Sequence, residues 1–235
     1  MASWTGLLPG SYTVTETNPG SVWSVAITGS PAVVSATGAP AAANVTNTYV
    51  LGELQVTKVV NWKGITPDTN KTFEICIQGP SYPTTPNCKT IGYQGGTLSW
   101  TNLLPGEYTV TETNPGSEWA VTISGSPAVV SLTRSVPTTI VTNARKLGGL
   151  QITKTVDWNG VPEDTAATFS ICIQGPSYPT TPNCKTVGYQ GGTLSWTSLI
   201  PGNYVVTESG VSGEWDVAIT GSPAVVPVNG GTGSA

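Results

Sequence analysis

The chain has 235 residues, a formal net charge of −4 and only 9% charged residues, against roughly 25% in an average soluble domain. Nine Lys and Arg residues in an acidic chain do not supply the basic face that nucleic-acid binding needs. Because the chain contains no His, a His-ligated metal ion, a Ser-His-Asp triad and a Cys-His pair are excluded. No apolar run approaches the roughly 20 residues of a membrane helix, so membrane insertion is not expected. We also expect no cofactor.

The chain repeats itself with a shift of 96 residues. The segment GPSYPTTPNCKT begins at Gly79 and again at Gly175, and the same shift relates Trp4 to Trp100. A repeat of this length is a domain rather than a solenoid unit. The start of the chain has no signal-peptide pattern, and the incomplete copies suggest an excerpt of a longer chain. We expect the second half of a repeat, one complete repeat and one repeat without its last strand, at 1–50, 51–146 and 147–235.

Period-2 patterning runs through the complete repeat in chain order. Apolar and polar residues alternate over 54–62, then over 72–77, and again over 108–111, as is typical of half-buried strands. Gly-Gly at 95–96, Pro-Gly at 105–106 and Asn-Pro-Gly at 114–116 are turn signals between such runs. No segment shows helical periodicity. The sequence therefore predicts an all-β fold with an immunoglobulin-like β-sandwich of about seven strands in each complete repeat.

Each of the last two repeats contains one pair of cysteines, Cys76 with Cys88 and Cys172 with Cys184. The absence of a Cys-x-x-Cys spacing argues against a metal site. We expect each pair to form a disulfide that closes a loop rich in Gly, Pro and Thr, which would stabilise the repeat by about 2–3 kcal/mol. Such disulfides imply an oxidising, extracellular setting. Two free buried thiols per repeat are the alternative.

Three kinds of polar residue occupy positions where the alternation demands an apolar one. A Lys lies in phase with the apolar residues of the first strand, a Glu with those of a late strand, and an Asn with those of the last strand. These residues are Lys58 and Lys154; Glu16, Glu112 and Glu208; and Asn47 and Asn143. We therefore expect their side chains to point into the core.

Two interpretations fit an inward Lys, Glu and Asn. The first is a buried Lys–Glu salt bridge that an Asn caps, because isolated buried charges cost several kcal/mol. The second is chemical. Burial lowers the pKa of an amine and raises that of a carboxyl group. A neutral Lys is a nucleophile that can attack the Asn side-chain carbonyl, a protonated Glu can stabilise the oxyanion, and ammonia leaves.

The segments LQVTK, LLPGEYTVTET and IVTN, in that order, resemble the collagen-adhesin B-repeat (CnaB) family, the prealbumin-like domains of bacterial surface proteins and pilins. The resemblance covers the whole chain as one full and two partial copies, and implies tandem prealbumin-like sandwiches. It also implies a spontaneous isopeptide bond between Lys58 and Asn143, with Glu112 as the catalyst. The cysteine-closed loop is not typical of the family.

The predicted function is that of a structural module in a surface fibre, stalk or pilus shaft, located outside the cell. An amide that joins a residue near the start of a repeat to a residue near its end would carry tension past the residues between them. The bond forms once and consumes its own side chains, so we expect no enzyme with turnover. The alternative is an adhesin-type module that binds a glycan or a host or matrix protein through exposed aromatic residues such as Tyr82, Tyr178, Trp23 or Trp119.

The two incomplete copies have opposite deficiencies. The copy at 147–235 has Lys154 and Glu208 but stops before its Asn strand, and Asn229 is out of register with Asn143. The copy at 1–50 has Glu16 and Asn47 without a Lys. An open strand edge recruits a strand from elsewhere. We therefore expect head-to-tail self-association, with a Lys154–Asn47 amide between neighbours; the alternative is that both ends are arbitrary cut points.

Overall fold

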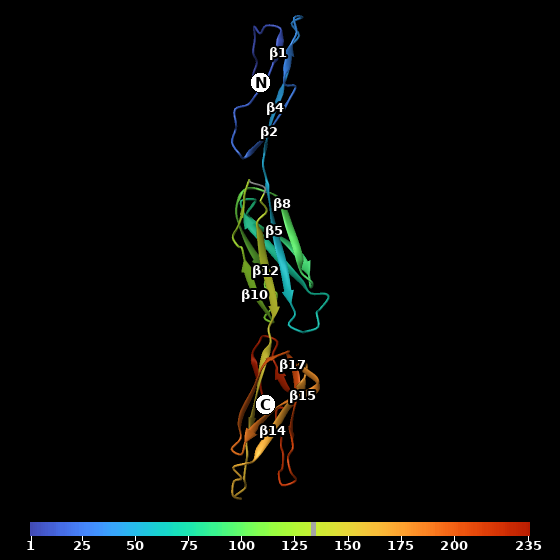
Figure 1. The fold of residues 1–235 in the computed structure, drawn as a ribbon, viewed down its shortest axis with the longest axis vertical. Helices are drawn as coiled ribbons and strands as arrows, with labels where there is room; N and C mark the ends of the chain where they lie inside the picture. Colours follow the sequence, from blue (N-terminus) through green and yellow to red (C-terminus); the bar gives the residue numbers. More distant parts are fainter. Residues whose placement is uncertain (133–134) are drawn as a thin grey trace.

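The computed structural model describes residues 1–132 and 135–235. An N-terminal part, a middle repeat and a C-terminal part follow one another along the long axis of the molecule (Figure 1). All regular structure in the described residues is β-structure, which confirms the predicted all-β class. The described residues accordingly contain no helix that could cross a membrane. The chain enters the middle repeat on strand β5 and leaves it on the neighbouring strand β12 (Figure 1).

Residues 52–145 form two four-stranded sheets. The first sheet has the order β10-β12-β5-β8, with bounds Trp119–Ser124, Thr138–Arg145, Gly52–Asn61 and Gly96–Leu103. The second has the order β11-β9-β6-β7, with bounds Ala128–Val130, Gly106–Glu112, Thr72–Gly79 and Tyr82–Gly92. The structure thus has eight strands in this repeat, where the sequence predicted about seven.

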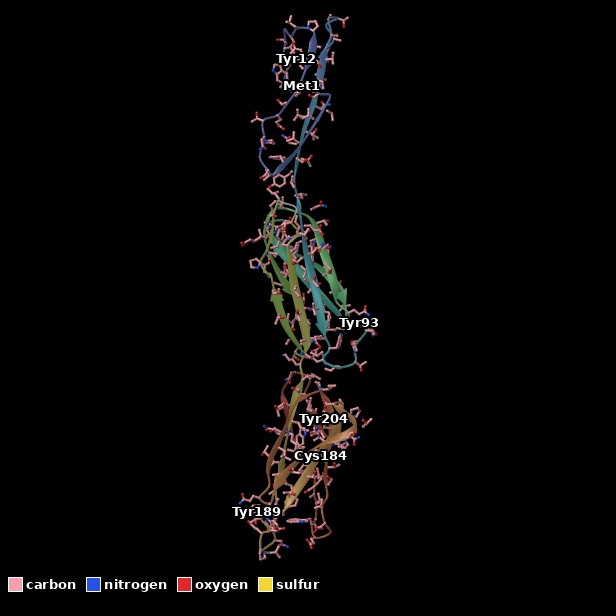
Figure 2. All side chains as sticks on the ribbon, viewed as in Figure 1. Met1, Tyr12, Tyr93, Cys184, Tyr189 and Tyr204 are labelled. Atoms are coloured by element: carbon pink, nitrogen blue, oxygen red, sulfur yellow. A yellow bond between two sulfur atoms is a disulfide. The ribbon has the colours of Figure 1, made fainter. Side chains whose placement is uncertain are left out.

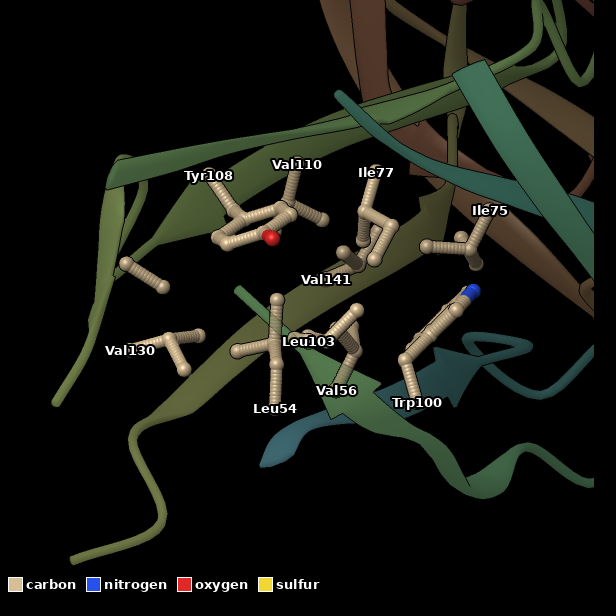
Figure 3. Close-up of a cluster of buried hydrophobic side chains, with 11 residues drawn as sticks. Leu54, Val56, Ile75, Ile77, Trp100, Leu103, Tyr108, Val110, Val130 and Val141 are labelled. Carbon is tan, nitrogen blue, oxygen red and sulfur yellow. The ribbon is translucent and has the colours of Figure 1, made fainter. Parts of the chain in front are cut away.

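The two sheets pack face to face around one apolar core (Figure 3). Leu54 and Val56 of β5 and Trp100 of β8 face Ile75 and Ile77 of β6 across this core. Each of these side chains is almost fully buried. Because successive side chains of a strand point to opposite faces, the inward positions of β5 include Lys58, which lies on the same face as Leu54 and Val56.

The C-terminal part repeats this arrangement. One sheet has the order β16-β13-β19, with bounds Gly192–Leu199, Gly148–Lys154 and Thr232–Ser234. The other has the order β15-β14-β17-β18, with bounds Tyr178–Gly188, Thr168–Gly175, Gly202–Ser209 and Ala224–Val226. A second apolar core lies between them. Residues 215–220, which correspond to β10, form no strand here.

The short strand β19 is a finding that the sequence did not predict. It pairs with β13 in parallel, with Ser234 opposite Gln151. This is the register of Thr138 opposite Gln55 between β12 and β5, shifted by one repeat. The C-terminal part therefore contains the beginning of the strand that carries Asn143 in the middle repeat.

The N-terminal part consists of two two-stranded sheets. One pairs β1 (Gly10–Tyr12) with β3 (Ala32–Val34), and the other pairs β2 (Trp23–Thr28) with β4 (Asn44–Tyr49). Every buried core residue that the structure describes lies after Gly52. Residues 1–50 therefore make strand pairs without an apolar core of their own.

Candidate site at Lys58, Glu112 and Asn143

Parallel pairing of β5 with β12 places Lys58 and Asn143 on neighbouring strands. Lys58 lies opposite Val141, and Asn143 lies opposite Val60. All four positions share the inward phase of their strands, so the two polar side chains point into the same core. Glu112, the last residue of β9, reaches them from the opposite sheet.

A single carboxylate oxygen joins the three side chains. Lys58 Nζ donates a hydrogen bond to Glu112 Oε1 at 2.7 Å. Asn143 Nδ2 donates to the same Oε1 at 3.0 Å. The Lys58 and Glu112 side chains are 0% and 1% exposed, and Asn143 is fully buried. The three residues that the sequence singled out therefore meet in one buried cluster.

Burial controls the charge of Lys58. Desolvation lowers the pKa of Lys58 from its ordinary value of 10.5, and the hydrogen bond and negative charge of Glu112 offset only part of that shift. The ring of Phe73 lies 4.5 Å from Nζ, and Trp119 packs edge-on against Phe73 with ring centroids 5.3 Å apart. The amine is thus held in an apolar pocket that favours its neutral, nucleophilic form.

Two oxygens of the cluster have no hydrogen-bond partner, although both are buried. They are Glu112 Oε2 and Asn143 Oδ1. A buried acceptor without a donor is costly, and these two belong to the groups that an amide-forming reaction would use. A half-turn of the Asn143 amide exchanges Nδ2 and Oδ1. A protonated Glu112 could then donate to Oδ1 at the position that Nδ2 now occupies.

The turn before β8 holds the backbone of Lys58 in place. Gly95 has a φ of +74°, and a Cβ at this position would lie 2.3 Å from the Lys58 carbonyl oxygen. Only glycine fits this close approach in a left-handed conformation. Gly191 makes the same approach to the Lys154 carbonyl oxygen, so this support is part of the repeat.

The C-terminal part brings together two of the three groups. Lys154 Nζ donates to Glu208 Oε2 at 3.0 Å. The Lys154 side chain is 17% exposed, whereas that of Lys58 is not exposed at all. Asn229 takes no part in this cluster, because it lies in a turn where its Oδ1 accepts a hydrogen bond from the Gly231 amide.

The N-terminal part holds the other pair. Asn47 Nδ2 donates to Glu16 Oε1 at 2.8 Å, the same contact that Asn143 makes with Glu112. This pair lies near the surface, although Glu16 Oε2 is buried and has no hydrogen-bond partner. The structure therefore assembles a Lys–Glu–Asn cluster once and leaves complementary pairs on either side of it.

Both predicted disulfides are present. Cys76 bonds to Cys88 and Cys172 to Cys184. The intervening segment is not the loop that the sequence suggested: it is a β-hairpin of β6 and β7, in which the two cysteines are direct cross-strand partners. Glu74 lies beside Cys76 and Cys88, but disulfide sulfurs are not thiolate ligands, so this group does not form a metal site.

Of the four aromatic residues proposed for ligand binding, one is buried, two are partly buried and one is exposed. Tyr82 begins β7 directly after the two-residue hairpin turn and is partly buried against the middle core, and Tyr178, which begins β15, does the same in the C-terminal part. Trp119 is 4% exposed. Only Trp23 is exposed, and it packs edge-on against Tyr49.

Sequence reasoning missed Phe73 as a member of the site. Its repeat counterpart Phe169 lies 4.7 Å from Lys154 Nζ, so the ring-over-amine contact occurs in both repeats. The signal was present in the sequence, because both phenylalanines are separated from the inward Lys of their repeat by the same number of residues. From the sequence alone, however, an inward Phe on a strand is expected only to be part of the apolar core.

No family model and no curated protein matches this chain. Among solved structures, it is similar to the Bacillus anthracis TIE protein, with 13% identity and a TM-score of 0.49 over 87% of this chain and 39% of that one. Two B repeats of the collagen-binding protein of Staphylococcus aureus align with 15% identity and a TM-score of 0.41 over 84% of this chain and 58% of that one. The major pilin of Streptococcus pyogenes aligns with 16% identity and a TM-score of 0.31 over 67% of this chain and 82% of that one. These likenesses are distant, and this chain spans less than two thirds of the first two proteins.

Proposed function

We propose that this chain is a structural part of an extracellular fibre, stalk or pilus shaft, and that its repeat at 51–146 locks itself with an amide between Lys58 and Asn143. One observation carries the proposal: Glu112 Oε1 contacts both the Lys58 amine and the Asn143 amide in a buried cluster. A carboxyl group between a nucleophile and an electrophile is placed to move protons from one to the other.

The reaction needs no group from outside the chain. A proton passes from Lys58 Nζ to Glu112, which leaves a neutral amine and a carboxylic acid. Nζ attacks Asn143 Cγ while Glu112 donates to Oδ1, where negative charge develops. The Nζ–Cγ bond forms, the Cγ–Nδ2 bond breaks, and ammonia leaves with the proton that Glu112 returns to it. Glu112 then takes up the second proton that Nζ loses on becoming an amide nitrogen, and so ends uncharged. The bond forms once, so the proposed role includes no catalytic turnover.

Desolvation supplies a reason for the bond. A buried ion pair is costly because both charges lose their hydration, and Lys58 and Glu112 are almost fully buried. The amide replaces the ammonium group by a neutral one and leaves Glu112 uncharged. The alternative from the sequence, a permanent salt bridge capped by Asn143, keeps that cost and both unpaired oxygens.

The topology converts this bond into a mechanical lock. The chain enters the middle repeat on β5 and leaves it on β12, and the two strands are parallel neighbours. Tension that enters at residue 52 would pass from Lys58 to Asn143 through the amide. Residues 59–142 would then not bear the force, as a shaft requires.

Two further features support an extracellular, self-associating protein. Cross-strand disulfides persist in oxidising compartments. Only 9% of the residues are charged, so little electrostatic repulsion opposes close contact between copies. Of the aromatic residues that favoured an adhesin, Trp119 is buried, and Tyr82 and Tyr178 are partly buried against the cores, so the structural role is the better supported one.

The intact mass of the reduced protein tests the proposal. We expect a loss of one ammonia from the middle repeat, and a branched tryptic peptide that joins Lys58 to Asn143. The variants Lys58→Met and Asn143→Ala should have their full calculated mass at this repeat, whereas Asn70→Ala, at an exposed turn position, should lose ammonia as the parent does. Full recovery of separate Lys58 and Asn143 peptides from the parent would contradict the proposal.

A further inference from the structure

The two disulfides occupy equivalent places in their repeats. Each joins direct cross-strand partners of a β-hairpin, with Cys76 opposite Cys88 in one and Cys172 opposite Cys184 in the other. The first cysteine of each pair is buried, at 7% and 4% exposure, whereas the second is exposed. Figure 2 labels Cys184 in the C-terminal part. A thiol in solution can therefore reach one sulfur of each bond.

In the middle repeat a carboxylate lies against the disulfide. A carboxylate oxygen of Glu74 is within 4.8 Å of the sulfurs of both Cys76 and Cys88. Thr113 Oγ1 donates a hydrogen bond to Glu74 Oε2 at 2.6 Å, and the Thr113 amide donates to the Glu74 carbonyl at 3.0 Å. These two bonds hold Glu74 beside the sulfurs, where its negative charge opposes the formation of a thiolate.

The C-terminal part has neutral residues at both of these positions. A shift of 96 residues takes Glu74 to Ser170. The same shift takes Thr113 to Ser209, which pairs with Ser170 on the neighbouring strand. The Ser209 hydroxyl lies 3.6 Å from the Cys172 sulfur. Because a disulfide sulfur carries no hydrogen, the hydroxyl is the donor, and it would stabilise the negative charge that Cys172 acquires when the bond opens.

The lysine that follows each exposed cysteine does not distinguish the two repeats. Lys89 Nζ donates to the Ser99 carbonyl in the middle repeat. Lys185 Nζ makes the equivalent bond to the Ser195 carbonyl. Because this cation is common to both sites, its effect on the sulfurs cancels when the two are compared. The difference between the disulfides therefore comes from Glu74 and from the hydroxyl that accompanies it.

We propose that Cys172–Cys184 is a thiol-exchange site, whereas Glu74 protects the disulfide of the middle repeat from the same reaction. An incoming thiolate approaches Cys184 at the outer edge of β15, the outermost strand of its sheet, on the side away from Cys172. A bond forms between the incoming sulfur and Cys184, the bond to Cys172 breaks, and its electron pair leaves with Cys172 as a thiolate. The product is a mixed disulfide at Cys184, and the incoming thiolate is the sole co-reactant.

Electrostatic repulsion sets the size of the expected difference. During exchange, one negative charge is spread over the three reacting sulfurs, and in the middle repeat two of these lie within 4.8 Å of a Glu74 oxygen. Repulsion between two unit charges at this separation in water corresponds to a reaction slower by about fourfold. The hydrogen bond from Ser209 adds to the difference, because it favours departure of the Cys172 thiolate.

Partial reaction with reduced glutathione tests the inference. The protein with both disulfides intact is incubated with the thiol, stopped with acid, and alkylated with N-ethylmaleimide in acidic denaturant. Trypsin leaves each cysteine pair within one peptide, 72–89 or 155–185, so mass spectrometry follows the two reactions separately. We expect the 155–185 peptide to react faster by about fourfold or more, with glutathione on Cys184 and the alkyl group on Cys172.

Charge variants separate this cause from a difference in stability between the repeats. Glu74→Gln keeps the shape of the side chain and should speed the reaction of the middle disulfide by about fourfold. Ser170→Glu should slow the reaction of the C-terminal disulfide, whereas the matched control Ser170→Gln should not. The effect of either charge should shrink in about 1 M salt, because salt screens exposed charges.

The opposite results are equally distinct. Equal rates at the two disulfides of the parent, or a faster reaction in the middle repeat, would overturn the inference. A faster C-terminal reaction that neither Glu74→Gln nor Ser170→Glu changes would also overturn it, because the difference would then come from local unfolding. Glutathione on the buried cysteine would contradict the direction of attack. These variants leave Lys58 and Asn143 in place, so the ammonia loss of the middle repeat tests the proposed function separately.

Discussion

Asn143 lies two positions beyond the direct strand partner of Lys58, because Lys58 pairs with Val141 while Asn143 pairs with Val60. This offset on parallel strands leaves both side chains on the inward face. Glu112 of the opposite sheet then bridges them through one oxygen. The relationship joins the first and last strands of the middle repeat, so a covalent bond at this point would connect the two ends of that repeat.

Glu112→Gln should leave Lys58 and Asn143 unlinked while the fold survives. An amide side chain has the same shape but cannot accept the proton that Lys58 must lose. Mass spectrometry of the purified variant should therefore show the full calculated mass at the middle repeat. The matched control is Glu107→Gln, an exposed position on the same strand, which should still lose ammonia. A linked Glu112→Gln protein would remove Glu112 from the reaction.

Asn143→Ala should lower the free energy of unfolding of the middle repeat by about 4 kcal/mol or more, since a cross-link that closes a loop of this length removes roughly that much chain entropy from the unfolded state. Denaturant unfolding, followed by the fluorescence of Trp100 and Trp119, measures the change. Asn70→Ala should unfold at the parent's midpoint. A midpoint shift of equal size in both variants would mean that the lost stability does not come from the link.

Alkaline pH should stabilise the unlinked protein. In Asn143→Ala the pKa of Lys58 stays below its ordinary value of 10.5 because of burial, so the unfolded chain binds a proton more readily than the folded one below that pH. The free energy of unfolding of this variant should therefore increase as the pH rises towards 10.5 and decrease again as the pH falls.

The measurement is the difference in unfolding free energy between Asn143→Ala and Asn143→Ala/Lys58→Met, in which the titrations of groups remote from residue 58 cancel. The free energy of unfolding of the single variant should increase relative to that of the double variant as the pH rises from about 8 towards 10.5. A difference that stays constant over this range, or that moves the other way, would mean that burial does not perturb Lys58.

Force on a single molecule should extend the middle repeat only when the link is missing. In Asn143→Ala, residues 59–142 become free to stretch by about 290 Å at roughly 3.5 Å per residue. The parent should show no such step from this repeat, because the amide carries the load. A step of this length in the parent protein would contradict the mechanical role.

The unreduced protein should take up no thiol-alkylating label, and after denaturation and reduction it should take up four equivalents, since the structure pairs all four cysteines. Replacing Cys76 and Cys88 together by Ser should cost about 3 kcal/mol of stability through the lost hairpin constraint. The ammonia loss of the middle repeat should persist in this variant, because neither cysteine belongs to the Lys58 cluster.

Local patterning determined much of this protein. Alternation of side chains along a strand depends only on the chain itself, so the inward placement of Lys58, Glu112 and Asn143 could be predicted. The 96-residue shift carried the same prediction to Lys154, Glu208, Glu16 and Asn47, and the spacing of the cysteines indicated both disulfides.

Pairing between distant strands decided the rest. Only the parallel contact of β5 with β12 brings Asn143 beside Lys58, and only the opposite sheet brings Glu112 between them. The tertiary structure also made the cysteine loop a hairpin, left Tyr82 and Tyr178 partly buried against the cores, and paired the short strand β19 with β13. None of these follows from a period, because strand neighbours and packing partners are set by contacts between residues far apart in the chain, whereas a period records only the direction in which each side chain points.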